Sequence, residues 1–519
     1  NVLAANTTGA GNTAVGRNAL DANTTAANNT AIGYGSLTDN TTGYGNVAAG
    51  KNALTNNTTG YHNTSIGADS METNTEGHSN TAVGESALLA TTDGDNNVAI
   101  GMDALKANTT ANSNTAVGSA AMIANTTGTQ NVAVGRSALD ANISASNNTA
   151  VGYEALTANT TGAHNTGIGK DALAANTTGD QNTALGRDAG QSITTGSNNV
   201  AIGVEALESV STTNMNIAIG KGAGAACTGA ENVFIGHEAG NDNTTAEYNT
   251  FIGNKAGTKN TTGTQNVALG AMALDANTTA NANTAIGYDC LTANTTGANN
   301  TAVGTFALDA NTTATDNTAV GKSAGTAITT GDYNVCVGMM AGDTITTGFR
   351  NTVIGQRADV SASNASYQIA LGEDLISTGA SRFTFGSGAG DNRVYNEFGT
   401  NASWTRVSDV RYKKDIQDNT DCGLAFINDL RPITYKWRKK SEIDPSLPDY
   451  DPTDSEGMPV STKKLYGLIA QEVKEAIDKH NITDFGGWTM TEEGAEIQGV
   501  SQEMFVHPLI KAVQELSAE

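Results

Sequence analysis

The hydrophobic and polar positions of this sequence repeat in a unit of seventeen positions along most of the chain. A typical unit reads N-T-A-V-G-x-x-A-L-x-A-N-T-T-G-x-x, and we number its positions from the recurring Gly, which is position 0. A fixed period indicates stacked structural units, and this length suits one coil of a β-solenoid. We therefore predict a rod of 22 coils over residues 1–381. Every step between glycines equals the unit length except that from 220 to 236, which is shorter by one, and the glycines stand at 16, 33, 50, 67, 84, 101, 118, 135, 152, 169, 186, 203, 220, 236, 253, 270, 287, 304, 321, 338, 355 and 372.

Exceptions to the pattern indicate which positions share the interior. Position −2 is usually Ala, position +4 is usually Leu or Met, and position +7 is usually Asn. Where +4 becomes Gly, either +7 becomes apolar or −2 becomes aromatic. Because a close-packed interior must fill each vacated volume, we predict that −2, +4 and +7 line one core. The pairs are Gly190 with Ile193, Gly224 with Cys227, Gly325 with Ile328, Gly342 with Ile345, Gly240 with Phe234, and Gly257 with Phe251.

The residues at position −1 indicate a second covered face. This position is aliphatic in every coil, as in Val15, Ile32 and Ile354, with Ala49 the smallest. Side chains alternate along a strand, so −1 points away from the core that −2 lines. A strand that is apolar on both faces is covered on both, and an apolar stripe along a whole rod marks an interface. The rod is therefore predicted to be an oligomer about its long axis.

Two further columns are interpreted as structural. Asn stands at −4 from Asn12 to Asn351, with Gln368 in the last coil. Stacked amide side chains bond to one another along a β-stack, so this column need not be a binding site. The recurring Gly, and the Gly that follows most Asn-Thr-Thr triplets, are expected at tight turns with positive φ.

The charge balance and the composition narrow the range of partners. The chain has 28 Lys and Arg and 52 Asp and Glu, a net charge of −24. We expect no nucleic acid partner, because a phosphate-binding footprint needs clustered Lys and Arg. No apolar run approaches the length of a membrane span, so no membrane insertion is expected. The four Cys residues have neither zinc nor disulfide-framework spacing. We interpret them as packing residues and expect no metal or cofactor.

Two regions follow the repeats. Residues 382–407 are rich in aromatic side chains and predict short strands that form a neck over the open end of the solenoid. From residue 408 onward Pro, Trp, Lys and Arg enter and helical spacing appears, which predicts a small α+β domain over 408–519. We expect helices at 421–430, 470–480 and 502–516, strands at 433–438 and 465–469, and a mobile, Pro-rich and acidic loop at 441–462.

The C-terminal region contains three motifs. They read Ser-Asp-Val-Arg-Tyr-Lys-Lys-Asp-Ile at 408–416, Leu-Arg-Pro-Ile-Thr-Tyr-Lys-Trp at 430–437 and Tyr-Gly-Leu-Ile-Ala-Gln-Glu-Val at 466–473. In this order they resemble the intramolecular chaperone auto-processing domain that ends endosialidases and phage tail fibres. More loosely, the repeats are similar to the heads of trimeric autotransporter adhesins.

This resemblance implies a homotrimer whose C-terminal domains assemble first and guide the fibre into register. It also implies that the domain cuts itself off between Val407 and Ser408, with Ser408 as the nucleophile and Lys413 as its base. A partly desolvated Lys can lose its proton and so activate a neighbouring hydroxyl. The candidates that would shape this site are Asp409, Arg411, Gln471 and Glu472.

We therefore predict a trimeric fibre or adhesin of the phage tail fibre kind, on a virion or at a cell surface. Its expected partner is a receptor on a host surface, with glycans as one candidate class. The only enzymatic activity expected is the single self-cleavage. Two other functions stay open. The Thr columns at −3 and in the Thr-Thr pairs resemble the arrays of ice-binding solenoids, although Val or Ile interrupts −3 in several coils. The chain also opens within a repeat, so we expect preceding sequence, where a glycan-degrading tailspike would hold its catalytic domain.

Overall fold

The structure is a computed structural model that describes residues 2–388, 393–397, 405–406, 416–436, 438–447, 450, 452, 465–490 and 497–518. The chain divides into two compact units, Asn1–Val407 and Ser408–Glu519.

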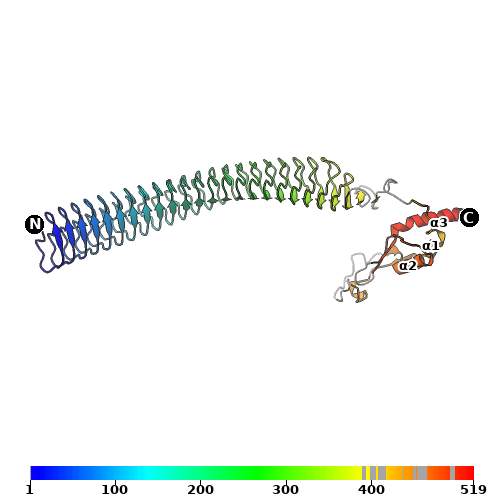
Figure 1. The fold of residues 1–519 in the computed structure, drawn as a ribbon, viewed down its shortest axis with the longest axis horizontal. Helices are drawn as coiled ribbons and strands as arrows, with labels where there is room; N and C mark the ends of the chain where they lie inside the picture. Colours follow the sequence, from blue (N-terminus) through cyan, green and yellow to red (C-terminus); the bar gives the residue numbers. More distant parts are fainter. Residues whose placement is uncertain are drawn as a thin grey trace. The chain divides into compact units, whose positions relative to one another are not determined.

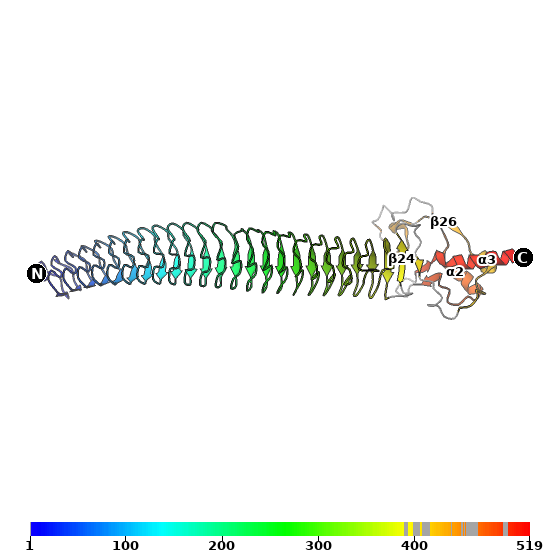
Figure 2. The same ribbon diagram turned by 90° about the horizontal axis from the view of Figure 1, so that it is seen from above.

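The N-terminal unit is a β-solenoid in which successive coils stack side by side (Figures 1 and 2), and this confirms the predicted fold class. Each of the 22 coils contributes one three-residue strand at positions −3 to −1. The strands pair in parallel, one coil apart, as in Thr13 opposite Thr30 and Val15 opposite Ile32. They are β1 (Thr13–Val15), β2 (Thr30–Ile32), β3 (Val47–Ala49), β4 (Thr64–Ile66), β5 (Thr81–Val83), β6 (Val98–Ile100), β7 (Thr115–Val117), β8 (Val132–Val134), β9 (Thr149–Val151), β10 (Thr166–Ile168), β11 (Thr183–Leu185), β12 (Val200–Ile202), β13 (Ile217–Ile219), β14 (Val233–Ile235), β15 (Thr250–Ile252), β16 (Val267–Leu269), β17 (Thr284–Ile286), β18 (Thr301–Val303), β19 (Thr318–Val320), β20 (Val335–Val337), β21 (Thr352–Ile354) and β22 (Ile369–Leu371).

The recurring Gly marks the closest approach between coils. At Gly152 φ is +141°, and a Cβ atom built there would lie 2.4 Å from the carbonyl oxygen of Gly169 in the next coil. A side chain at this position would therefore force neighbouring coils apart. The Gly after Asn-Thr-Thr is different, because Gly43 does not have a positive φ and Ala26 takes the same place in another coil. The expectation of a positive φ there was wrong: the position is small because it is buried.

The interior confirms the predicted shared core. The side chains at −2, +4 and +7 are buried in coil after coil, together with an Ala at +3 that the sequence pattern had not singled out. A Cβ atom built on Gly257 would lie 2.5 Å from the ring of Phe251 in the same coil. One built on Gly190 would lie 3.0 Å from Cδ1 of Ile193. The two positions of each pair thus compete for one volume.

Two internal columns of Asn tie the coils together. At −4, the Asn12 side-chain oxygen accepts the Asn29 backbone N–H at 2.9 Å, and the Asn29 amide donates to the Gly43 carbonyl at 2.9 Å. At +7, the Asn40 amide donates to the Asn23 side-chain oxygen at 3.0 Å. Buried amides are costly unless they are bonded, and the repeat supplies the partners from the coils on either side. The Asn columns are therefore structural, as predicted.

The shorter coil, between Gly220 and Gly236, keeps these columns aligned. The Asn216 amide donates to the Gly229 carbonyl, 13 residues ahead, where the corresponding bond elsewhere spans 14 residues. The missing residue is at +9, in an exposed turn, so every inward position stays in phase.

The outward face of the strands carries an aliphatic strip, which we define as the side chains at −1; beside it, position −3 is Thr, Val or Ile. In the single chain much of it is open to solvent: Val15 is 58% exposed, Ile32 47%, Leu269 45% and Leu371 44%. This strip is the second apolar face that the sequence predicts.

In the part of residues 382–407 that the structure describes, three strands follow the last coil. β23 (Arg382–Gly386) pairs in parallel with β22, β24 (Arg393–Glu397) pairs antiparallel with β23, and β25 (Thr405–Arg406) pairs antiparallel with β24. The edge of β22 is thus hydrogen-bonded rather than free; the neck over 382–407 stays a prediction.

Within its described residues, the C-terminal unit combines three α-helices with two antiparallel strand pairs, β26 with β27 and β28 with β29. Its core comprises mainly Phe426, Val473, Ile477 and Phe505. The predicted helices are present, but the first begins later than expected, and β28 and β29 had not been predicted. Most of the predicted mobile loop 441–462 lies outside the described residues. The elements are α1 (Leu424–Asp429), β26 (Ile433–Tyr435), η2 (Lys440–Glu442), β27 (Leu465–Gly467), α2 (Ala470–Lys479), β28 (Trp488–Met490), β29 (Gln498–Val500), η3 (Gln502–Phe505) and α3 (Val506–Ala518). Among the described residues, no helix combines the length and apolar character that crossing a bilayer requires.

Candidate functional site

The residues predicted to cut the chain belong to the first C-terminal motif. Val407, Ser408, Asp409, Arg411 and Lys413 all lie outside the described residues, which resume at residue 416. Their roles therefore stay predictions. The elements around the second and third motifs are described.

The second and third motifs meet in space. Strands β26 and β27, one from each motif, pair antiparallel, with Ile433 opposite Gly467. Just outside this pair the Arg431 guanidinium donates two hydrogen bonds to the Glu472 carboxylate, one of them from Nε at 3.0 Å. The bond from Arg431 lowers the pKa of Glu472 below its usual value. Glu472 thus has a defined contact, whereas Gln471 beside it is exposed.

Two further polar contacts were not predicted from the sequence. Asp429, at the end of α1, accepts bonds from Lys479 Nζ at 2.7 Å and from His480 Nε2 at 2.5 Å, at the end of α2. These bonds lower the pKa of Asp429 below its usual value, and the bond from Lys479 has the larger effect. Because the partners are about 50 residues apart in sequence, no local spacing could have indicated the pair.

The other contact joins α3 to the start of α1. Glu515 Oε2 accepts the Leu424 backbone N–H at 2.7 Å. This bond satisfies a donor that the first turn of a helix leaves without a partner. A Cβ atom built on Gly423 would lie 2.3 Å from the same carboxylate oxygen. Gly423 therefore makes room for a tertiary cap on α1.

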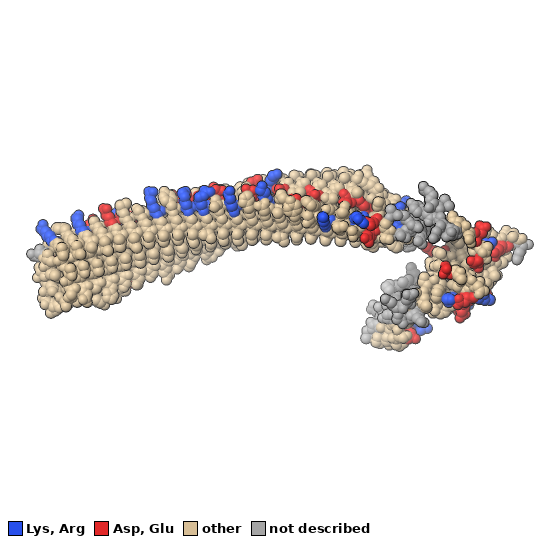
Figure 3. All heavy atoms as spheres, viewed as in Figure 1, with Lys and Arg blue, Asp and Glu red and all other residues tan. Residues whose placement is uncertain are grey.

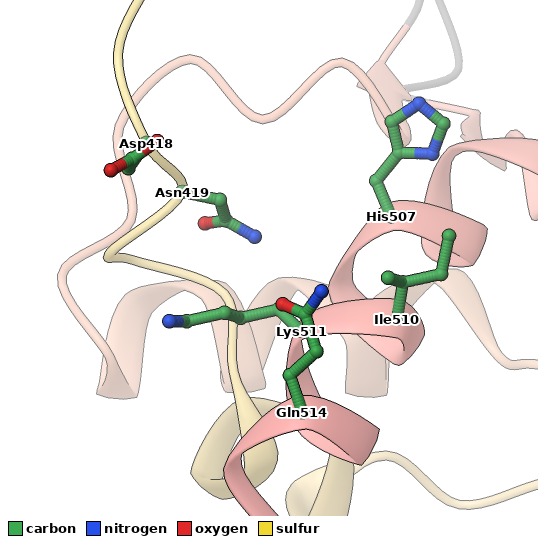
Figure 4. Close-up of a pocket in the computed structure, with 6 residues that line it drawn as sticks. All are labelled: Asp418, Asn419, His507, Ile510, Lys511 and Gln514. Atoms are coloured by element: carbon green, nitrogen blue, oxygen red, sulfur yellow. The ribbon is translucent and has the colours of Figure 1, made fainter.

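An open pocket of about 490 Å³ lies between residues 418–419 and α3 (Figure 4). His507 and Lys511, one turn apart on α3, border it, and Asn419 points toward it from the facing segment. A smaller hollow of about 280 Å³ shares Asn419 and His507 and continues toward Phe485. Among the described residues, no three His, Cys, Asp or Glu side chains are grouped to hold a metal ion. The pocket is open and mixed in chemistry, which suits a contact surface better than an enclosed reaction site.

Helix α3 also presents a large apolar face to solvent. Its buried residues, Pro508 and Ala512, are small and lie toward α1. The larger apolar side chains follow a spacing of three and four residues on the other side, which is the seam of a coiled coil. They are Val506 at 50% exposed, Leu509 at 51%, Ile510 at 52%, Val513 at 58% and Leu516 at 61%.

Comparison with known proteins adds one finding. No curated protein matches the chain. Residues 408–482, which include all three motifs, match the family model described as "Chaperone of endosialidase". That match covers the C-terminal unit through the end of α2 and leaves the solenoid unmatched. The region C-terminal to the fibre-like β-solenoid is thus similar to the chaperone domain of endosialidases over residues 408–482.

Proposed function

We propose that the protein is a homotrimeric attachment fibre, a tail fibre or surface adhesin, whose C-terminal domain drives assembly and then releases itself. The observation that carries this proposal is the aliphatic strip, because it runs the length of a rod attached to a chaperone-type domain. Apolar stripes of that length are costly in water and mark interfaces. Three chains that turn their strips toward a common axis would remove all three strips from solvent.

The exposed face of α3 supports the same assembly at the C-terminal unit. Leu509 and Val513 would meet their counterparts in a three-helix seam. A C-terminal unit that associates first would hold three solenoids side by side while their coils form. This order matters, because neighbouring coils are nearly identical and their strips alone do not distinguish one register from another.

We further propose self-cleavage at the Val407–Ser408 bond. Lys413, as the neutral amine, takes the proton of the Ser408 hydroxyl. The Ser408 oxygen then attacks the carbonyl carbon of Val407. An ester forms, the peptide C–N bond breaks, and the proton passes to the departing Ser408 amine. Water then hydrolyses the ester, leaving a free carboxylate on Val407 and restoring the hydroxyl. The match to the chaperone family and the Ser-Lys spacing support this assignment, and such a dyad needs a base that can be neutral.

Intact-mass spectrometry of the expressed chain tests the cleavage. Wild type is expected to yield a fragment that begins at Ser408, whereas Ser408→Ala, Lys413→Ala and Lys413→Arg are expected to stay uncut. The Arg variant keeps the positive charge but cannot lose its proton. It therefore distinguishes a role of Lys413 as a base from a role as a positive charge. Cleavage in Ser408→Ala would rule out this nucleophile. An uncut wild type would leave the domain as a permanent trimer clamp.

Attachment to a host-surface receptor is proposed on the fibre architecture alone. Binding of the purified trimer to a glycan array tests the glycan class, and the absence of any signal would direct the search to protein receptors. The ice-binding alternative predicts thermal hysteresis. One feature speaks against it: the Thr hydroxyls at +8 donate to carbonyls of the next coil, as from Thr41 to Thr58 at 3.0 Å, so they are already engaged.

A further inference from the structure

Two charged borders flank the aliphatic strip. We define the +1 border as the residues at position +1, just after each strand, and the −5 border as those at −6 and −5, just before it. Seven of the twelve Lys and Arg residues of the coils are at +1, against two acidic residues there. The −5 border has six Asp and Glu and one Arg. Figure 3 shows many of the Lys and Arg side chains along the upper edge of the rod, with acidic side chains among them.

The charges on these borders are not all neutralised within the chain. Lys170 and Arg187 contact the acidic residue that follows each of them. Lys221 and Lys322 are exposed and form no ion pair with any described residue. Opposite them, Glu231 and Asp316 on the −5 border likewise have no cationic partner among the described residues, and Asp316 only accepts the Asn299 amide at 3.1 Å.

A threefold arrangement makes unlike borders meet. When three chains turn one face toward a common axis, the contacts are heterologous, so one side of each chain touches the other side of the next. The three chains stand at the same height, and therefore coils of the same number face each other. With a rise of about 4.8 Å per coil, a +1 residue lies about 2 Å above the −5 residue of its own coil. It lies about 3 Å below the −5 residue of the next coil.

We infer that in the trimer the +1 border of each chain contacts the −5 border of its neighbour through salt bridges that cross the interface. Lys322 pairs with the partner's Asp316, in the facing coil, and Lys221 pairs with the partner's Glu231, one coil further on. This inference rests on the proposed trimer. It adds which side of one chain contacts which side of the next. Complementary charge at the rim of an apolar contact adds specificity more than affinity.

Crosslinking of the full-length chain tests the contact. Lys322→Cys and Asp316→Cys are placed in one chain and treated with a short bis-maleimide. The two positions lie at opposite ends of β19, too far apart for the reagent to bridge within a chain. The native thiols are buried, and burial raises the pKa of Cys290 and Cys336 to about 12, so they should stay unreactive. A covalent trimer is expected from the double variant and none from either single variant.

Matched controls make each outcome decisive. Ala327→Cys with Asp316→Cys places one thiol at +6 of the coil that holds Lys322, at the same height but away from both borders, and should give no covalent trimer. Covalent dimers from a single variant would show that identical borders meet and would overturn the inference. A trimer by light scattering that the double variant cannot crosslink would also overturn it, while leaving the proposed fibre intact. A monomer by light scattering would instead refute the proposed trimer itself.

Charge reversal tests whether the salt bridges matter. Lys322→Glu should lower the temperature at which the trimer dissociates at low ionic strength, and the shift should shrink at high salt concentration, where screening is strong. Adding Asp316→Lys to this variant should restore much of the lost dissociation temperature. Lys259→Glu makes the same change of charge off the borders and should shift nothing. If Lys322→Glu and Lys259→Glu shift the dissociation temperature equally, the salt bridges at the borders do not stabilise the trimer.

Discussion

Replacement of Phe251 tests the shared-volume rule that organises the solenoid interior. Phe251 is fully buried, its ring centroid lies 5.7 Å from that of Phe234, and it occupies the space that a Leu side chain fills from position +4 in most coils. Phe251→Ala should destabilise the local structure by about 3–5 kcal/mol per chain, because it removes a large buried side chain and leaves a cavity.

A compensating change on the same coil should recover part of this loss. Gly257 has φ +57°, close to the +58° of Leu274 at the same position one coil later, so the backbone already suits Leu. In wild type the new side chain would clash, since its Cβ atom would lie 2.5 Å from the Phe251 ring. We therefore expect Gly257→Leu alone to be destabilising by about 1–3 kcal/mol. In the Phe251→Ala background it should instead restore about 1–3 kcal/mol by filling the cavity.

Hydrogen exchange with mass spectrometry measures these effects locally, at β14, β15 and β16, where a whole-fibre melt would average them. A loss of about 3–5 kcal/mol corresponds to a roughly 100- to 5,000-fold decrease in amide protection. Coils far away, such as that containing β4, serve as the internal control and should not change. If the double variant exchanges as fast as Phe251→Ala, positions −2 and +4 do not share one volume and the reasoning is wrong.

Three further predictions concern both units. Gly152→Ala should break the ladder between β9 and β10, detected as fast exchange confined to those strands; unchanged protection would refute the close-approach argument. Val513→Lys on α3 should prevent assembly while leaving the far-ultraviolet circular dichroism of the C-terminal unit intact, and a normal trimer by light scattering would contradict the proposed seam. The C-terminal unit should lose stability on acidification, because Glu472 and Asp429 have lowered pKa values when folded; their stabilising contribution is complete above their unfolded pKa values, near 4, and disappears as pH falls through the folded values. Glu472→Gln should flatten that pH dependence in thermal melts, and an unchanged slope would show that the Arg431 contact does not matter.

The repeat made most of the solenoid predictable. A fixed period sets the strand register, and the paired exceptions at −2, +4 and +7 act as an internal set of compensating mutations. The pattern could not reveal the backbone conformation of the +4 residues, such as Leu20 with φ +50°. Leu rarely adopts this conformation, and only the stacking of coils imposes it. The small residue after Asn-Thr-Thr was likewise attributed to φ when burial is its cause.

The C-terminal unit was less predictable because its contacts join residues far apart in sequence. The Arg431–Glu472 pair spans 41 residues and the Glu515 cap on Leu424 spans 91, so neither follows from local spacing. Helix α2 was predicted closely because its apolar face has a regular period. Strands β28 and β29 were missed, since each has only three residues and neither alternates clearly. The predicted cleavage residues derive from a motif resemblance alone. Cleavage assays on variants of these residues test the prediction.

The mass of the native particle tests the central claim most directly. Multi-angle light scattering of the Ser408→Ala chain, which keeps every residue in one piece, should give three times the single-chain mass of 52.9 kDa. The aliphatic strip should then be protected from solvent labelling along its whole length. A stable, soluble particle with the mass of one chain and with that strip fully accessible would contradict the account.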